Sequence, residues 1–271
     1  MSRAAVVGLG LIGGSVALGA GARGYDREDG VREHARRRGI DAVDSLAEAV
    51  AGADLVVTAV PTDETPALLR AVAALAPGAV LTDCASLKRA VAAAAHTLDA
   101  GVRFVASHPM AGGRGHGLEA ASGGLFRGRP WAIVPTARSD DGAIAAVRAF
   151  CISLGARPVL LDAEQHDHVM TWASHLPQAV ASALARAAGT GGGASLPDLA
   201  GPGLLDATRL AGQPVSLALE LALADPDALA RAIDAVSREL TGVSSALRRG
   251  DAGALRALFE DAAAARRTFE R

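Results

Sequence analysis

The stretch Ala5-Val6-Val7-Gly8-Leu9-Gly10-Leu11-Ile12-Gly13-Gly14-Ser15 decides the fold of the first half of this 271-residue chain. A short apolar run, which is typical of a buried strand, leads into the spacing Gly-x-Gly-x-x-Gly. Gly8 permits a tight turn, Gly10 leaves space for a pyrophosphate against the backbone, and Gly13 lets the next helix pack on the strand. The N–H groups at the start of that helix favour phosphates. The stretch therefore predicts a dinucleotide site of the Rossmann type, formed by Gly8, Gly10, Leu11, Ile12 and Gly13.

Composition argues against several other classes of protein. Half of the residues are hydrophobic, which is enough for a substantial core, and the formal net charge of −2 offers no basic surface for nucleic acid or an anionic membrane. Two cysteines, Cys84 and Cys151, are too few for a disulfide framework and lack metal-ligand spacing. We find no targeting segment and no apolar run of about 18 residues, so we expect a cytoplasmic protein that spans no membrane.

Short apolar runs alternate with helical patterns up to Leu161. We expect strands at Ala4–Val7, Asp54–Val60, Ala79–Thr82, Arg103–Ala106, Ala132–Val134 and Arg157–Leu160, and helices that include Val31–Arg38, Thr65–Ala76 and Leu87–Thr97. Unbroken apolar strands are typical of a parallel sheet that is covered on both faces. Residues 1–161 are therefore predicted to form an α/β domain of the doubly wound Rossmann type, the dinucleotide-binding domain.

Helical periodicity dominates after Leu161. One long helix is expected over Asp162–Ala188, with a bend near Pro177, followed by the Gly-rich stretch Gly189–Gly203 and at least three further helices. Residues 162–271 are predicted to form an all-α helical domain. Helices rich in Ala and Leu often pack against a second copy, so we expect a homodimer through this domain. The alternative is a helical domain that packs only on itself.

The adenosine end of the cofactor site depends on Asp26. An acidic residue would bind the ribose hydroxyls there, but only 12 residues separate Asp26 from Gly13, where about 20 are expected after the glycine turn. Either the βαβ unit is shortened, or Asp26 is a solvated loop residue. A carboxylate at the ribose favours NAD because it would repel a 2′-phosphate, whereas the adjacent Arg27 leaves NADP open. Val60, at the carboxyl end of an expected strand, would border the nicotinamide ribose, unless Pro61 only ends that strand.

Four further segments carry polar side chains where the pattern predicts apolar ones: Thr82–Lys88, Phe104–Gly112, Ala173–Gln178 and Leu205–Arg209. With the glycine-rich start and Ala53–Pro61, they resemble the prephenate/arogenate (cyclohexadienyl) dehydrogenases of tyrosine biosynthesis. The matching elements are Ser-Leu-Lys at 86–88, His-Pro-Met-Ala-Gly at 108–112, Leu-Phe-Arg-Gly at 125–128, Ser-His-Leu-Pro at 174–177 and Asp-x-Thr-Arg at 206–209. The resemblance extends over nearly the whole chain.

The resemblance implies a Rossmann domain, a helical substrate and dimerisation domain, and one reaction. In that reaction prephenate undergoes NAD-dependent oxidative decarboxylation to 4-hydroxyphenylpyruvate. Hydride leaves the ring carbon that bears the 4-hydroxyl, carbon dioxide leaves the opposite carbon, and the ring becomes aromatic. Three alternatives stay open: an arogenate dehydrogenase, a dehydrogenase of a modified prephenate such as 4-amino-4-deoxyprephenate, and a non-catalytic dinucleotide sensor.

The same resemblance assigns roles to individual residues. His108 is the base or hydrogen-bond acceptor for the 4-hydroxyl proton, which suits a neutral imidazole. Ser86 binds the same hydroxyl or orients His108, and Arg209 clamps a substrate carboxylate in a bidentate pair. Ser174, His175 and Gln178 line the substrate pocket. The alternatives from the residues alone are a helix N-cap for Ser86, an ion pair for Arg209 and a core position for His175.

Three positions depart from the family's pattern, and two histidines suggest other chemistry. Gly113 and Arg114 stand where Ser or Thr, then often Glu, are usual, and Gln178 stands where many members carry His. Because Gln178 is neutral, a substrate that bears an amino group would be better tolerated. His166 and His168 mimic a metal-binding spacing, but positions i and i+2 do not share a helix face, so we expect no metal site.

Overall fold

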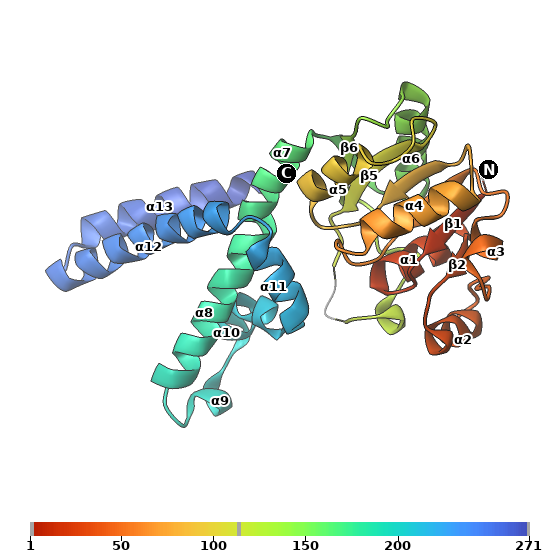
Figure 1. Ribbon diagram of the computed structural model, residues 1–271. Coiled ribbons are helices and arrows are strands. Elements are labelled where there is room, and N and C mark those ends of the chain that lie inside the picture. The colour runs from red at the N-terminus through yellow and green to blue at the C-terminus, as the bar shows by residue number, and fades with distance from the viewer. Residues whose placement is uncertain (1–2, 113–114, 270–271) are drawn as a thin grey trace. The chain divides into compact units, whose positions relative to one another are not determined.

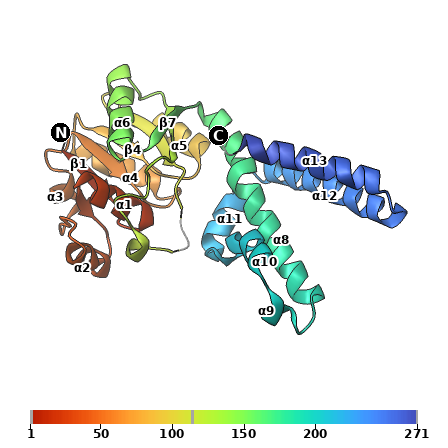
Figure 2. The same cartoon turned by 180° about the vertical axis from the view of Figure 1, so that it is seen from behind.

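The computed structural model describes residues 3–112 and 115–269. The chain divides into two compact units, Met1–Asp167 and His168–Arg271, and each is described by itself. The first unit is a sheet with helices on both faces, and the second consists of helices (Figures 1 and 2). The predicted fold class, an α/β Rossmann-type domain followed by an all-α domain, is confirmed.

The seven strands of the first unit form one sheet in the order β2-β1-β3-β4-β5-β6-β7. Their bounds are β1 Ala4–Val7, β2 Arg23–Tyr25, β3 Leu55–Thr58, β4 Val80–Asp83, β5 Arg103–Pro109, β6 Pro130–Pro135 and β7 Arg157–Leu160. Neighbouring strands are parallel except β5 and β6, which are antiparallel with His108 opposite Ala132. Our expectation of a parallel sheet is therefore wrong at that pair. The described part of the β5–β6 connection contains one short 3-10 turn, η1 (Leu118–Ala120), and no crossover helix that would return the chain to a parallel start.

Two layers of helices cover the sheet. Helices α1 (Leu11–Ala20), α2 (Asp29–Arg37) and α6 (Asp141–Ser153) bury apolar side chains against one face. Helices α3 (Leu46–Val50), α4 (Thr65–Leu75) and α5 (Lys88–Ala95) cover the other face. Successive strand residues alternate between the two cores: Val6, Val57 and Val105 pack on the first, whereas Val7, Val56 and Phe104 pack on the second. This double burial explains why the strands read as unbroken apolar runs.

The strand order reverses at β1, which lies between β2 and β3. In open α/β sheets ligands bind at such a switch point, outside the carboxyl ends of the strands. The glycine turn after β1 and the segment after β3 meet there. Gly8 has a φ of +92°, and a Cβ built on it would lie 2.4 Å from the Ala59 carbonyl oxygen. The turn thus requires glycine both for its conformation and for this close approach.

All elements named after β7 are helices or helical turns. Helix α7 (Ala163–Met170) leads into a π-helical turn, η2 (Thr171–His175), followed by α8 (Leu176–Gly191), α9 (Leu196–Leu199), α10 (Pro202–Ala207), the 3-10 turn η3 (Arg209–Gly212), α11 (Val215–Leu223), α12 (Pro226–Arg249) and α13 (Ala252–Thr268). The π turn stands where a bend was expected, because the Pro177 ring excludes the α-helical hydrogen bond to Ala173. None of the described helices is both long and apolar enough to cross a membrane.

The glycine turn generates a test of the fold. A Cβ on Gly13 would lie 1.8 Å from the Gly8 carbonyl oxygen, whereas a Cβ on Gly10 meets nothing within 4 Å. We expect Gly13→Ala to lower the free energy of unfolding in urea by about 1–3 kcal/mol, as overpacking does. Gly10→Ala is the matched control and should change it by less than about 0.5 kcal/mol. Equal effects of the two substitutions would contradict this packing.

Candidate active site

The structure brings several of the predicted site residues to one edge of the sheet. The glycine turn follows β1, Val60 follows β3, and Ser86 lies in the loop between β4 and α5. His108 is the penultimate residue of β5 and is half-buried. Because β1, β3, β4 and β5 are parallel, these segments all leave the sheet at its carboxyl edge.

Asp26 directly follows β2, which pairs with β1 through Gly24 and Val6. The first βαβ unit is therefore shortened, because α1 has only ten residues. The strand β2 forms at Arg23–Tyr25, although this stretch has a poor sequence for a strand. One carboxylate oxygen of Asp26 accepts the N–H of Leu9 at 2.8 Å, inside the glycine turn. Arg27 is bound to the Glu64 carboxylate at 2.9 Å. The contact with Leu9 contradicts the alternative of a purely solvated Asp26.

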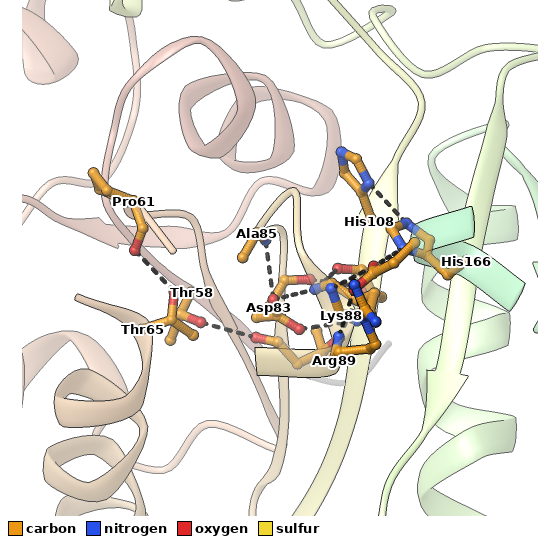
Figure 3. Close-up of polar contacts among 12 residues, drawn as sticks. Thr58, Pro61, Thr65, Asp83, Ala85, Lys88, Arg89, His108 and His166 are labelled. Atoms are coloured by element: carbon orange, nitrogen blue, oxygen red, sulfur yellow. Dashed lines mark hydrogen bonds and ion pairs between the residues drawn. The ribbon is translucent and has the colours of Figure 1, made fainter. Parts of the chain in front are cut away.

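A buried ion pair lies beneath the loop that carries Ser86. Asp83 and Lys88 are both fully buried, and their side chains are in contact (Figure 3). Asp83 also accepts the N–H groups of Ala85 at 3.0 Å and Ser107 at 2.9 Å. The Lys88 ammonium donates to the Ser107 carbonyl at 2.7 Å. The pair therefore fixes the loop around Ser86 and the strand residue that precedes His108.

The hydroxyl of Ser107 completes this buried cluster. It donates to the Asp83 backbone carbonyl at 2.7 Å and accepts hydrogen bonds from the Thr82 hydroxyl and the Trp131 indole N–H, each at 3.0 Å. Three strands, β4, β5 and β6, are joined through this one side chain. Satisfied buried networks of this kind hold one conformation, because an alternative would leave polar groups unpaired.

A second chain of contacts reaches His108 itself. Its Nδ1 lies 3.0 Å from Nε2 of His166 (Figure 3). Nδ1 of His166 lies 2.7 Å from the carboxylate of Asp167. His166 and Asp167 lie in the part of α7 that belongs to the first unit, and both are buried. The Asp167 carboxylate also accepts the N–H groups of Lys88 and Arg89, each at 2.9 Å.

Asp167 keeps its charge in this setting. Burial raises the pKa of the Asp167 carboxyl, but hydrogen bonds from the His166 ring and from the N–H groups of Lys88 and Arg89 outweigh burial, and the net shift is downward. Those N–H groups begin α5, where the helix dipole also favours an anion. Asp167 thus caps α5, and Leu87 is its N-cap residue without a side-chain cap. The alternative role of Ser86 as the N-cap is therefore wrong.

Within the second unit, a hydrogen bond joins the elements that carry two of the predicted substrate residues, Gln178 and Arg209. Gln178 is buried, and its amide donates to the Leu210 carbonyl at 2.9 Å. This contact ties α8 to η3, where Arg209 is exposed. Ser174 and His175 lie in the π-helical turn, half-buried and buried respectively.

Thiol chemistry does not suit either cysteine. Burial raises the pKa of the Cys84 thiol well above its usual range, and burial raises the pKa of Cys151 to about 12. Both side chains are therefore protonated near neutral pH, and a thiolate nucleophile is not available from them. Among the described residues no group of three or more His, Cys, Asp or Glu is placed to hold a metal ion.

Two family models match the chain. The nucleotide-binding domain of prephenate dehydrogenase matches residues 19–160, and the dimerization domain of prephenate dehydrogenase matches residues 162–261. The chain belongs to the prephenate dehydrogenase family. The glycine turn precedes the first match, so it supports the nucleotide site independently.

Relatives in this family carry different names. A prephenate dehydrogenase of Lactococcus lactis is 31% identical over the whole of this chain and 78% of its own length. A 4-amino-4-deoxyprephenate dehydrogenase of Streptomyces pristinaespiralis is 34% identical over 88% of this chain and 78% of its own length. The crystal structure of Synechocystis arogenate dehydrogenase is 28% identical, covers 98% of this chain and 99% of its own, and has a TM-score of 0.82. Membership of the prephenate dehydrogenase family therefore does not select the substrate.

His166 and Asp167 are the residues whose importance sequence reasoning missed. In the sequence His166 formed a metal-like pair with His168, and His166-Asp167 also fitted the family's helix at the domain junction, but neither observation gave His166 a role in the reaction. In the structure His168 is exposed, whereas His166 is fully buried. A buried His-Asp pair in the first turns of a largely polar helix was the available signal, but its partner His108 is 58 residues away.

The buried ion pair generates a test in this prephenate dehydrogenase relative. Lys88→Met should lower the free energy of unfolding by about 3–5 kcal/mol, because it leaves the buried carboxylate of Asp83 uncompensated. The double variant Asp83→Asn/Lys88→Met removes both charges and should recover a large part of that loss. Urea unfolding of the wild type, both single variants (Lys88→Met and Asp83→Asn) and the double variant measures the effect. Additive losses in the double variant would contradict a coupled pair.

Proposed function

We propose that this protein is an NAD-dependent dehydrogenase that converts prephenate to 4-hydroxyphenylpyruvate by oxidative decarboxylation, in tyrosine biosynthesis. The observation that carries the proposal is the position of His108, at the same sheet edge as the glycine turn and with its Nδ1 held by His166. A nicotinamide cofactor held by the glycine turn would supply the acceptor for the hydride of the ring carbon that bears the 4-hydroxyl. His108 takes the hydroxyl proton, while carbon dioxide leaves the opposite carbon with its bonding electrons retained by the ring.

The glycine turn fits a dinucleotide. The N-cap of α1 is Gly10, which has no side-chain cap, and the first turn of α1 contains no acidic residue. A Cβ built on Gly10 would meet no atom within 4 Å, so the space beside the first backbone N–H groups of α1 is open. A pyrophosphate would bind there, with Leu11, Ile12 and Val60 along the cofactor. Asp26 would accept hydrogen bonds from the ribose hydroxyls, which favours NAD. Arg27 is paired with Glu64, so its charge is already balanced and it is less suited to bind the 2′-phosphate of NADP.

Several polar side chains would hold the substrate. Ser86 would bind the 4-hydroxyl or orient His108, on a loop that the Asp83–Lys88 pair holds in place. Arg209, exposed in η3, would pair with a substrate carboxylate through its planar fork. Ser174, His175 and Gln178 would make the remaining contacts.

A homodimer through the helical unit is part of the proposal. Leu240, Leu247 and Phe259 on α12 and α13 are each about 60% exposed, so these two helices present large apolar side chains to solvent. The family model that matches residues 162–261 is named a dimerization domain. Burial of such helices against a second copy would cover these side chains. We also propose a cytoplasmic location, which is consistent with two free cysteines.

A dehydrogenase of an amino-bearing substrate is the second candidate. Gln178 has its amide N–H committed to Leu210, so its carbonyl oxygen is the group that would accept a hydrogen bond from an amino group. The Streptomyces pristinaespiralis relative is named for 4-amino-4-deoxyprephenate, and the Synechocystis structure for arogenate. The other residue that suggested this candidate, Gly113, lies outside the described residues.

Formation of NADH, followed by its absorbance, tests the proposed reaction. We expect turnover with NAD and prephenate, and a higher kcat/KM for prephenate than for arogenate or 4-amino-4-deoxyprephenate. His108→Asn should lower kcat by about 10²–10⁴-fold with little change in KM, because it removes the general base. Preference for an amino-bearing substrate would favour the second candidate. Cofactor binding without turnover on any of the three would indicate a dinucleotide sensor.

A separate experiment tests the cofactor site. Gly10→Ala should raise the Kd for NAD at least about tenfold, because the added methyl group occupies the space where the pyrophosphate meets the backbone. Isothermal titration calorimetry measures Kd, and the urea transition of the same sample verifies that the fold is kept. An unchanged Kd would place the dinucleotide elsewhere.

A further inference from the structure

Three side chains form a hydrogen-bonded line that ends at the proposed base. The carboxylate of Asp167 contacts Nδ1 of His166, and Nε2 of His166 contacts Nδ1 of His108. An ionised carboxylate only accepts hydrogen bonds, so Nδ1 of His166 must carry the proton. In neutral His166 the other nitrogen, Nε2, is then an acceptor, and the proton between the two rings must come from His108. Neutral His108 therefore carries its proton on Nδ1, and its Nε2 has the lone pair.

We propose that His166 and Asp167 are positioning residues that hold His108 in the tautomer able to accept the substrate proton at Nε2. The inference rests on the proposed function and extends it to two residues outside the motifs that identified the reaction. When the hydroxyl proton reaches Nε2, the His108 ring becomes a cation with both nitrogens protonated. Its Nδ1–H still donates to His166, and the negative charge of Asp167 beyond His166 stabilises the cation. The added proton leaves from Nε2 to solvent after the product departs.

The charged groups around these three side chains leave Asp167 as the anion that stabilises protonated His108. Asp167 keeps its negative charge because α5 begins at its oxygens, as Lys88 and Arg89 donate their backbone N–H groups there. The Arg89 guanidinium lies 3.4 Å from the same carboxylate on a half-exposed side chain. The ammonium of Lys88 is directed to Asp83 and Ser107. The Lys88 charge is therefore balanced by Asp83, and Asp167 is the anion in contact with His166.

The same carboxylate connects the two residues proposed to contact the 4-hydroxyl. Ser86 lies two residues before the first helical residue of α5, whose N–H groups end on Asp167. His108 is linked to Asp167 through His166. A shift of Asp167 would therefore displace the serine and disturb the protonation of the histidine together. A buried histidine that only fills space would have no such effect on the reaction.

Variants at position 166 distinguish a residue that positions His108 from one that only fills space. His166→Phe keeps a ring but removes the acceptor, so kcat with prephenate should fall about 10–100-fold, a part of the effect of losing a general base. KM and the Kd for NAD should change little. His166→Gln restores an acceptor oxygen and should recover most of kcat. His168→Phe, at the exposed histidine two residues on, is the matched control and should retain the activity of the wild type.

The pH profile provides a readout that packing alone would not move. Without the stabilising carboxylate, protonated His108 is disfavoured, so the acid limb of kcat should move to lower pH in Asp167→Asn and His166→Phe. Folded His166→Phe with an unchanged kcat and pH profile would overturn the proposal. Equal losses in Phe and Gln variants, in parallel with lowered stability, would also overturn it.

The Asp167–His166–His108 line, here called the relay, and the proposed reaction can be tested separately. Wild-type protein without turnover on any of the three substrates would contradict the reaction. The relay would then be judged by the NMR titration of the His108 ring protons. A lower titration midpoint in His166→Phe than in the wild type supports the relay, and identical midpoints contradict it.

Discussion

The carboxylate of Asp167 accepts hydrogen bonds from the first N–H groups of α5 and from the ring of His166, which in turn holds His108. One buried charge thus joins the helix after Ser86 to the histidine at the end of β5. The charge is tolerated because helix N–H groups and an imidazole replace the water that burial removes. Movement of α5 would remove hydrogen bonds from the carboxylate, and movement of His108 would break its contact with His166.

Asp83 is a second buried carboxylate that joins the loop of Ser86 to β5. Its carboxylate joins Lys88, the loop residue Ala85 and the strand residue Ser107, all within the protein interior. Two carboxylates therefore hold the loop of Ser86 and the end of β5. If Ser86 and His108 act as proposed, they are oriented before the substrate arrives, so less reorganisation is needed in the transition state. The glycine turn follows β1 at the same edge of the sheet, where the dinucleotide is proposed to bind.

The sequence predicted what local patterns determine. The glycine turn, the apolar strands and the change to helices after Leu161 depend on neighbouring residues, and the fold class follows from them. The direction of β6 was not predictable in this way, because it depends on the connection from β5. The unusual spacing before Asp26 left two alternatives, and the contact with Leu9 favours the shortened unit. The contact of His166 with His108 was missed because it depends on a residue far away in sequence and on burial, which a helix pattern does not report.

The ring nitrogens of His108 offer the most direct test of the Asp167–His166–His108 line. A long-range ¹H–¹⁵N NMR spectrum of histidine-labelled protein, recorded at a pH where His108 is neutral, distinguishes a protonated from an unprotonated ring nitrogen. We expect Nδ1 of His108 to be protonated and Nε2 to be unprotonated. A proton on Nε2 instead would contradict the line, because the lone pair would then face His166 and the ring could not accept the substrate proton.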